Sequence, residues 1–345
     1  MDDVASVSNA GAGQFDLSQN GTFVYRTGKA GQETFSLIVL PGGGSAKMQT
    51  LMSKPGSYHT PRFSPDGRRV ALAIESGTGM DLSAYDLESD SVSRLTFAGQ
   101  ESFNPVWAPD GKHIAFESVA GDSYGISWVR SDGAGGVQKL LEGKYNVLPH
   151  SISADSRRLA YYQEDPETHL DIWTTVLDMT DPDHPKAGKP EAFARTASNE
   201  MEPAFSPDGR WLAYASDESG SYDVYVRPFP QAAGGGKWQI SSGGGKAPVW
   251  SRKERSLFFE NLDNRIMVAP YAVNGDSFLA SKPRVWSDQE LVSPTPYVNF
   301  DLAPDGTRIV GLVRPQAAEG TRGSVHVTFL LNFLDELRRK VPVGK

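Results

Sequence analysis

A short turn motif recurs along the chain at a nearly constant interval. Its clearest copies read FSPDGRRVALA from residue 63, WAPDGKHIAF from 107, FSPDGRWLAYA from 205 and LAPDGTRIVGL from 302. With three weaker copies (LSQNGTFVY, ISADSRRLAYY and WSRKERSLFFE) they give seven anchors, at Gly21, Gly67, Gly111, Ser156, Gly209, Glu254 and Gly306. The intervals are 46, 44, 45, 53, 45 and 52 residues. A fixed period means that each copy is one supersecondary unit.

Each copy contains the parts of a four-stranded antiparallel unit. An apolar strand such as PVW or PAF leads into the turn, where Pro presets φ, Asp bonds nearby backbone and Gly accepts a positive φ. A second, nearly continuous apolar strand follows, as in RWLAYAS, which is typical of strands buried on both faces. A polar hairpin, a third strand and a weaker fourth complete the unit. The period fits a propeller blade, and a β-sandwich with similar turns is the alternative.

The seven anchors predict an all-β fold, a β-propeller of seven four-stranded blades that forms a single domain over residues 1–345. We expect blades to start near residues 14, 59, 103, 147, 201, 246 and 298, with a C-terminal tail at 332–345. The last copy lacks a fourth strand, so we expect the N-terminal strand, in residues 1–14, to close the ring and remove its exposed edges. Six blades is the alternative, if the degenerate copy at Gly21 is not a full blade.

The composition excludes several classes of function. The chain has no cysteine, so it has no disulfide, thiolate nucleophile or Cys-based zinc site. A net charge of −8 without a basic block argues against a nucleic-acid partner. No apolar run reaches the ~20 residues of a membrane span, and the acidic start lacks the apolar stretch of a signal peptide. We expect a soluble monomer without a cofactor, in a compartment that the sequence leaves open.

Three local features suggest chemistry and have simpler explanations. GDSYG at 121–125 matches the G-x-S-x-G nucleophile elbow, but that motif needs a strand-to-helix turn, and here a blade hairpin is expected. The six histidines never fall in an H-x-H or H-E-x-x-H spacing, so no local metal site is predicted. The acidic insertion DMTDPDHP at 178–185 could hold a cation, but a solvated loop is the expectation.

The remaining candidate site is the central channel, where the innermost strands of a propeller converge. Alignment of the copies places one residue of each at an equivalent position: Asp16, Arg62, Val106, Ser151, Ala204, Val249 and Asp301. A second set stands two residues earlier, so period two predicts the same strand face: Gln14, Thr60, Asn104, Pro149, Glu202, Ala247 and Asn299. We expect the innermost strands to present these side chains at their entry ends.

Two interpretations of the channel residues stay open. Asp16, Arg62 and Asp301 would belong to three neighbouring blades and form either an ion-pair cluster that locks the ring or part of a polar ligand pocket. His59, His150, Glu200 and Lys246 would extend that pocket at the channel mouth, where Glu200 and Glu202 could serve as acid and base. The candidate ligand-binding residues are Asp16, His59, Arg62, Asn104, His150, Glu200, Glu202, Lys246, Asn299 and Asp301. The tryptophans are expected between blades.

The repeat unit resembles the TolB-type propeller repeat, a relative of the WD-type blade. The segments GTFVYRTG, PAFSPDGRWLAYASDESGSYDVYVRPFP, KWQISSGGGKAPVWSR and VTFLLNFLDELRRKVP also resemble the propeller region found C-terminal to many bacterial serine/threonine protein kinases, over residues 10–343. The kinase motifs G-x-G-x-x-G-x-V, HRD and DFG are absent from this sequence. The resemblance therefore implies the sensor or scaffold half of such a protein, extracytoplasmic by analogy, and carries no catalytic residues over.

We hypothesise a non-catalytic propeller that binds a small polar ligand or a protein partner, as the sensor or scaffold module of a kinase-type signalling protein. One alternative is a hydrolase or lyase that acts on a polar small molecule or glycan in the central channel. Another is a scaffold that binds protein across its flat face. Because propellers host all three functions, the choice depends on the channel residues.

Overall fold

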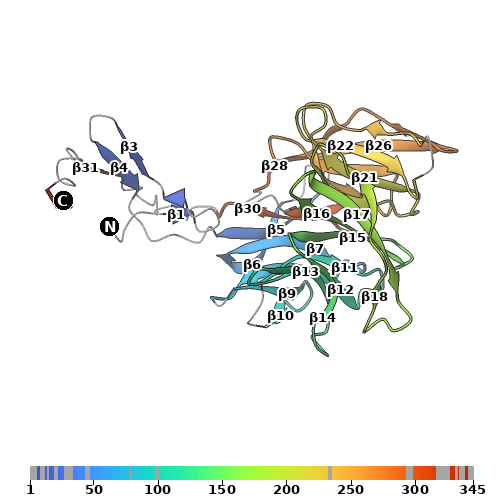
Figure 1. The fold of residues 1–345 in the computed structure, drawn as a ribbon, viewed down its shortest axis with the longest axis horizontal. Helices are drawn as coiled ribbons and strands as arrows, with labels where there is room; N and C mark the ends of the chain where they lie inside the picture. Colours follow the sequence, from blue (N-terminus) through green and yellow to red (C-terminus); the bar gives the residue numbers. More distant parts are fainter. Residues whose placement is uncertain are drawn as a thin grey trace. The chain divides into compact units, whose positions relative to one another are not determined.

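The computed structural model divides the chain into two compact units (Figure 1). Met1–Thr34 and Pro315–Lys345 form the smaller unit, and Phe35–Arg314 form the larger one. The structure describes residues 6–7, 12–13, 15–18, 22–26, 34–42, 47–77, 79–97, 101–231, 235–292, 298–315, 327–330, 333 and 339–340. No helix in these parts of the chain has the length and apolar character that a membrane crossing requires.

The smaller unit contains two short antiparallel sheets in its described residues. The first pairs β1 (Ser6–Val7) with β2 (Ala12–Gly13). In the second, β4 (Phe23–Arg26) lies between β3 (Phe15–Leu17) and β31 (Val327–Leu330). The Phe23 and Phe333 rings stack with their centroids 4.7 Å apart. Strands from the two ends of the sequence therefore meet in this unit.

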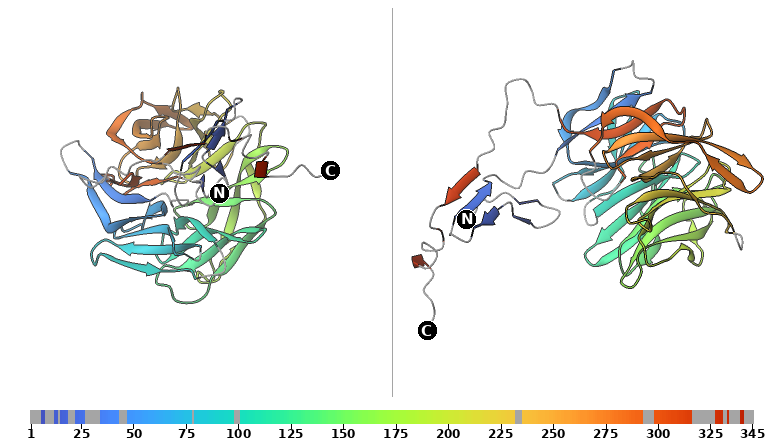
Figure 2. Two further views of the ribbon diagram at one scale, coloured as in Figure 1. Left: turned by 90° about the vertical axis from the view of Figure 1, so that its left-hand side faces the viewer. Right: turned by 90° about the horizontal axis from the view of Figure 1, so that it is seen from above.

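The larger unit is a six-bladed propeller of antiparallel sheets (Figures 1 and 2). Blade 1 comprises β7 (Tyr58–Phe63), β8 (Arg69–Glu75), β9 (Met80–Asp86) and β10 (Ser91–Arg94). Blade 2 comprises β11 (Glu101–Trp107), β12 (His113–Ala120), β13 (Ser123–Arg130) and β14 (Gln138–Gly143). Blade 3 comprises β15 (Val147–Ile152), β16 (Arg158–Asp165), β17 (His169–Asp178), β18 (Lys186–Ala187) and β19 (Glu191–Ala194).

The other three blades repeat this plan, from an inner strand outward. Blade 4 comprises β20 (Glu200–Phe205), β21 (Trp211–Ser216), β22 (Asp223–Pro228) and β23 (Trp238–Gln239). Blade 5 comprises β24 (Lys246–Trp250), β25 (Ser256–Glu260), β26 (Arg265–Asn274), β27 (Ser277–Ala280) and β28 (Arg284–Glu290). Blade 6 comprises β29 (Phe300–Leu302), β30 (Arg308–Val313), β5 (Phe35–Pro41) and β6 (Gln49–Gly56).

Blade 6 closes the ring with strands from both ends of the larger unit. The antiparallel register of β30 and β5 runs from Arg308↔Pro41 to Val313↔Ser36. Closure was expected from residues 1–14, but blade 6 takes its outer strands from β5 and β6. The outer strands are β5 and β6, because the apolar segment FSLIVLP provides a strand that can be buried on both faces.

The prediction of seven blades was wrong, and the six-blade alternative is correct. In its described residues, the region of the first turn copy forms the two strands β3 and β4, which pair with each other, and β4 also pairs with β31. Gly21 itself lies outside the described residues, as does most of the tail at 332–345. The copy LSQNGTFVY matches the inner hairpin of a blade. The next strands in the sequence, β5 and β6, do not complete that blade but form the outer strands of blade 6.

Each S-P-D-G turn is held by its own side chains. In blade 1, Ser64 Oγ donates a hydrogen bond to Asp66 Oδ1 at 2.5 Å, and the same oxygen accepts Arg68 N–H at 3.1 Å. Gly67 follows with a φ of 70°, which explains the glycine. The Ser-to-Asp bond recurs in blades 3 and 4, between Ser153 and Asp155 and between Ser206 and Asp208. GDSYG likewise forms a hairpin turn, with Ala120 paired to Ser123.

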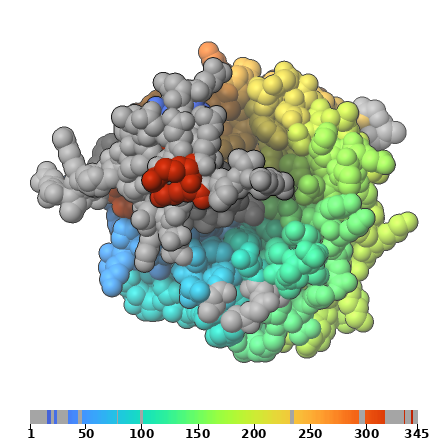
Figure 3. All heavy atoms as spheres, turned by 60° about the vertical axis from the view of Figure 1, so that its left-hand side comes forward, coloured from blue at the N-terminus to red at the C-terminus, as the bar shows by residue number. Residues whose placement is uncertain are grey.

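The hydrophobic core lies between neighbouring blades. The space-filling view shows these blades side by side in chain order, from blue through green to yellow (Figure 3). Trp128 of blade 2 packs with Leu159 of blade 3, and Trp211 of blade 4 packs with Phe259 of blade 5. Trp107 Nε1 also donates to the backbone oxygen of Arg62 in blade 1 at 3.0 Å. The tryptophans therefore join blades, as predicted.

The acidic insertion after β17 is largely exposed, as expected, and its residue Asp183 contacts blade 2. Asp183 Oδ1 lies 2.8 Å from His113 Nε2 and 3.0 Å from Arg130 Nη1. On its other side, His113 Nδ1 lies 2.7 Å from Asp110 Oδ2. The His113 ring is buried and stacks on Trp128, with 5.4 Å between centroids. The described residues contain no group of three or more acidic or histidine side chains placed to hold a metal.

His113→Ala should lower the free energy of unfolding by about 2 kcal/mol, because the buried imidazole links two carboxylates from different blades. Urea denaturation of the full chain measures this change. His184→Ala is the matched control, since His184 is exposed and its pairing partner is Asp181 in the same loop. It should change the value by less than about 0.5 kcal/mol. Equal losses in the two variants would contradict the proposed anchoring role.

Candidate functional site

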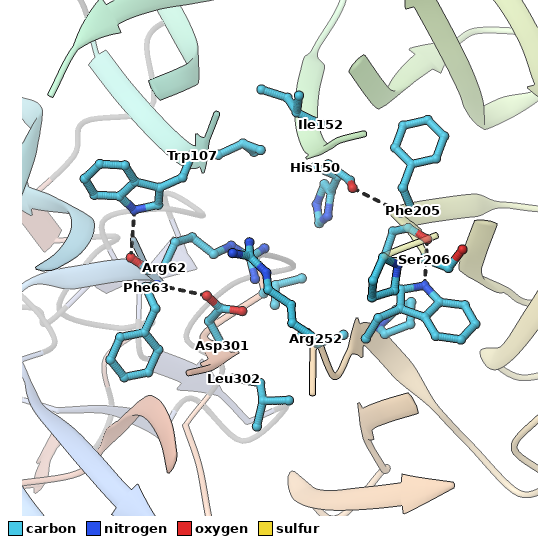
Figure 4. A pocket seen from close by; sticks show the side chains of 18 of the residues that line it. Arg62, Phe63, Trp107, His150, Ile152, Phe205, Ser206, Arg252, Asp301 and Leu302 are labelled. Carbon is cyan, nitrogen blue, oxygen red and sulfur yellow. Dashed lines mark hydrogen bonds between the residues drawn. The ribbon is translucent and has the colours of Figure 1, made fainter. Parts of the chain in front are cut away.

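The inner strands of the six blades enclose a cavity of about 320 Å³ at the centre of the ring (Figure 4). These strands contact one another in sequence around the ring, and β29 contacts β7 at the closure. Six residues at the equivalent position of the repeat line the cavity: Arg62, Val106, Ser151, Ala204, Val249 and Asp301. Residues of the following turns also line it: Pro109, Ala154, Pro207, Arg252 and Pro304. The cavity therefore lies at the turn end of the inner strands, not at their entry end.

A β-bulge interrupts the inner strands just before the cavity. The pairing register shifts between His59 and Arg62, and equivalent shifts occur in blades 2, 3, 4 and 5. Four residues of the second aligned set have a positive φ near 50–60°: Thr60, Asn104, Glu202 and Ala247. The extra residue breaks the two-residue alternation, so the two sets do not share one lining face around the whole ring. Of the second set, Glu202 and Ala247 line the cavity.

Several bulge residues join neighbouring blades. Glu202 Oε2 accepts the Ala247 N–H of blade 5 at 2.5 Å, and Asn299 Oδ1 accepts the Thr60 N–H of blade 1 at 3.2 Å. These bonds satisfy buried amides that the bulges remove from the sheet ladder. Asn104 differs, since its side chain donates to Glu117 Oε2 at 2.7 Å within blade 2.

Arg62 and Asp301 connect the two blades that meet at the ring closure. Asp301 Oδ2 accepts the Phe63 N–H of blade 1 at 2.9 Å, and Arg62 Nη1 donates to the Phe300 oxygen of blade 6 at 3.1 Å. Each side chain thus bonds the backbone of the other blade, and the two do not form a direct ion pair. Arg62 and Asp301 therefore link the two blades and also line the cavity.

Burial dominates the electrostatics of the cavity. It raises the pKa of Asp301, while the positive charge of Arg62 acts in the opposite direction. Burial also lowers the pKa of Arg62, and together with that arginine it holds the pKa of His150 well below its usual range, so His150 is neutral at pH 7. Burial raises the pKa of Glu202 to about 7, against the hydrogen bond from Ala247 and the charge of Lys246.

Arg252 is a cavity residue that the sequence reasoning missed. Its side chain extends from the turn after β24, and Figure 4 shows it pointing toward Arg62 and Asp301 at the centre of the pocket. Among the described residues it makes no hydrogen bond or ion pair. A signal was available: the copy WSRKER places Arg252 where the other turns of the ring have Pro or Ala, so the alignment marked a charge at a lining position.

Five predicted site residues belong to the propeller but do not line the cavity: His59, Asn104, Glu200, Lys246 and Asn299. Asn299 instead accepts the Thr60 N–H of blade 1. His59 Nε2 bonds Ser57 Oγ at 3.2 Å, while Glu200 bonds Thr196. Lys246 Nζ lies 3.8 Å from Glu260 Oε1.

Asp16 lies outside the six blades. It is an exposed residue of β3, and the side-chain oxygen Oδ1 accepts the N–H of its neighbour Leu17. The expected cluster of Asp16, Arg62 and Asp301 on three successive blades therefore does not form. Because the ring has six blades, Arg62 and Asp301 lie on directly adjacent blades, and the structure brings together Arg62, His150, Glu202 and Asp301 in one cavity.

Comparison with known proteins agrees with this architecture. Residues 32–183 match the PD40 family, the TolB beta propeller domain. An uncharacterized protein of Agrobacterium fabrum is 27% identical over 187 residues, which cover 52% of this chain and 61% of that protein. An uncharacterized peptidase of Bacillus subtilis is 24% identical over 173 residues, which cover 48% of this chain and 24% of that protein. The chain thus matches less than two thirds of either relative.

Solved structures show the same fold. A TolB candidate from Agrobacterium tumefaciens superposes with a TM-score of 0.61 at 18% identity, over 83% of this chain and 100% of that chain. TolB from Acinetobacter baumannii gives 0.53 at 14% identity, over 87% and 78%. A puromycin-hydrolyzing peptidase of Mycobacterium tuberculosis gives 0.51 at 15% identity, over 77% and 46%. At these identities the likeness concerns the fold alone, which is that of a six-bladed β-propeller, and the match to the TolB beta propeller domain covers residues 32–183 of this chain.

Proposed function

We propose that this propeller is a non-catalytic binding module whose central cavity takes up a small polar ligand or a polar segment of a protein partner. The observation that carries the proposal is the pair Arg62 and Arg252. Both reach the cavity of about 320 Å³, and most of their N–H groups have no partner in the described protein. Small concave sites with a few convergent polar groups are the usual form of ligand pockets.

Glu202 supports a second candidate, a hydrolase or lyase that acts on a polar small molecule or glycan. A pKa of about 7 suits a general acid or base at neutral pH, and Glu202 lines the cavity. Against it, the carboxylate already accepts the Ala247 N–H and is only 3% exposed. Relatives named as peptidases favour a hydrolase only weakly, because the match covers 24% of the Bacillus protein.

The wider setting proposed here rests on resemblance of sequence. The blade segments and the tail VTFLLNFLDELRRKVP support a sensor or scaffold module of a kinase-type signalling protein, acting as a monomer in an extracytoplasmic compartment. This setting and the binding function are independent proposals, since a cavity can bind a ligand in any compartment.

A thermal-shift screen of the full chain against amino acids, sugars, uronic acids, organic acids and short peptides tests the binding function. A ligand at 100 times its Kd should stabilise the fold by about 2.7 kcal/mol and raise the melting temperature. Ala204→Trp, which fills the cavity, should remove the shift, whereas Val92→Trp on the exposed face of β10 should keep it. If no compound gives a shift that Ala204→Trp removes, the proposal fails.

A further inference from the structure

We infer that the cavity selects a ligand with a single carboxylate on a small apolar body, held by Arg62 and Arg252. The inference rests on the proposed binding function and names the chemical class of its ligand. Two features of the wall carry it: a surplus of positive charge at the centre and apolar side chains around that charge. Figure 4 shows both guanidinium groups directed into the same central space.

The net charge of the cavity wall is positive, so the cavity can accept one more negatively charged group. Arg62 and Arg252 contribute two positive charges, and Asp301 contributes one negative charge that the Phe63 N–H fixes to the wall. His150 is neutral at pH 7, and Glu202 is partly protonated there because burial raises its pKa. A monoanion therefore brings the cavity near neutrality, whereas a dianion would leave an excess of negative charge beside Asp301 and Glu202.

The hydrogen-bond inventory points to the same group. A guanidinium has five N–H donors, arranged in a planar fork that matches a carboxylate. Arg62 donates to the Phe300 oxygen, and Arg252 donates to none of the described residues. Both guanidinium groups point into the cavity (Figure 4), so a carboxylate placed between the two arginines can accept hydrogen bonds without breaking an existing one.

The rest of the wall favours an apolar body for the ligand. Around the arginines the cavity is lined by aliphatic and proline side chains (Val106, Pro109, Ile152, Val249, Leu302 and Pro304) and by the polar residues His150, Ser151 and Ser206. A second charged group of the ligand would lose its water against the apolar part of this wall without an ionic partner. The chemistry is shared by a free organic acid and by the C-terminal residue of an apolar peptide, and the experiment separates these two sources.

Isothermal titration of the full chain at pH 7.5 and low salt tests the inference. The probes are 3-phenylpropionate and its neutral isostere 3-phenylpropanamide, with the peptide Gly-Gly-Phe as free acid and as C-terminal amide. Each acid that binds should bind about ten times or more tightly than its amide, because hydrogen bonds to charged groups are the stronger ones. Binding by the phenylpropionate alone indicates a free acid, and tighter binding by the peptide acid indicates a C-terminus.

Arg252→Gln should weaken acid binding about tenfold or more and leave amide binding unchanged. Arg252 is exposed, so the melting temperature without ligand should not change. Arg255→Gln is the matched control, an exposed arginine of the same turn that does not line the cavity. Amides that bind as tightly as acids, equal affinities in the Arg252 and Arg255 variants, or no binding by either acid would overturn the inference. If a neutral or cationic compound then gives a shift that Ala204→Trp removes, the binding function stands alone; if none does, both fail.

Discussion

A chain of residues 57–315 should fail to fold, whereas a chain of residues 34–315 should form the complete propeller. The two fragments differ by the segment that contains β5 and β6, the outer strands of blade 6. Without it, blade 6 consists of β29 and β30 alone, and the paired edge of β30 becomes exposed. Unpaired edges promote aggregation, and closure of a propeller normally removes them.

The loss of stability expected without β5 follows from the packing of its side chains, which alternate between the cores on its two faces. Leu37 and Val39 pack with the core of blade 1, while Ile38 and Leu40 pack on the other face with the core of blade 5. Burial of each such side chain contributes about 1.5–3 kcal/mol, so the four together contribute about 10 kcal/mol. That is comparable to the whole stability of a typical domain, about 5–15 kcal/mol.

Circular dichroism, gel filtration and urea denaturation of the two fragments measure the outcome. The 34–315 fragment should elute as a compact monomer and unfold cooperatively. The 57–315 fragment should aggregate or lack a cooperative transition, and a separate peptide of residues 34–56 should restore part of the transition. A compact, cooperatively unfolding 57–315 fragment would refute the closure by β5 and β6.

The sequence predicts the inner hairpin of each blade well, but it predicts the number of blades and the closure of the ring less well. The S-P-D-G copies report the hairpin between the first two strands of a unit, because Ser64, Asp66 and Gly67 each have a local role in that turn. They carry no information about whether two outer strands follow. The copy at Gly21 was therefore counted as a blade, although the next strand, FSLIVLP, pairs with β30 at the far end of the propeller. Such long-range pairing leaves no periodic signal.

The cavity was predictable to the extent that it follows the repeat. Alignment alone assembles Arg62, Ser151 and Asp301 with three apolar residues in one wall, because equivalent positions of a ring face the same centre. The bulges were not predictable from two-residue alternation, since Thr60 and Glu202 adopt a positive φ that neither residue type favours. Arg252 was missed because it lies in a turn that has lost the motif.

Glu202→Gln should make the propeller more stable at pH 8 and flatten the dependence of its stability on pH. Glu202 is 3% exposed, and burial raises its pKa from 4.5 to about 7 in the folded state. Between these two values the folded protein holds a proton that the unfolded chain has released. The free energy of unfolding therefore falls as the pH rises from about 4.5 to about 7, and the penalty stays constant above that range.

A shift of this size corresponds to a penalty of about 3 kcal/mol for the ionised carboxylate at pH 8. The glutamine side chain cannot ionise, and its carbonyl oxygen can still accept the Ala247 N–H that Glu202 Oε2 accepts at 2.5 Å. We expect the variant to gain up to about 3 kcal/mol at pH 8 and to match the native protein near pH 4.5. Some pH dependence should persist, because burial also raises the pKa of Glu117 to about 7.

Urea denaturation of the native chain and the variant from pH 4.5 to pH 8.5 measures the two curves. Glu254→Gln serves as the control, because Glu254 is an exposed residue of the turn in blade 5. Its curve should run parallel to that of the native protein, with a constant offset. If the Glu202→Gln curve is also parallel, Glu202 does not titrate as a buried group in the fold, and the acid or base role considered for it loses its support. If the two curves diverge above pH 5 as expected, burial penalises the ionised form of Glu202 in the folded protein. Any binding measurement on the cavity must then control the pH.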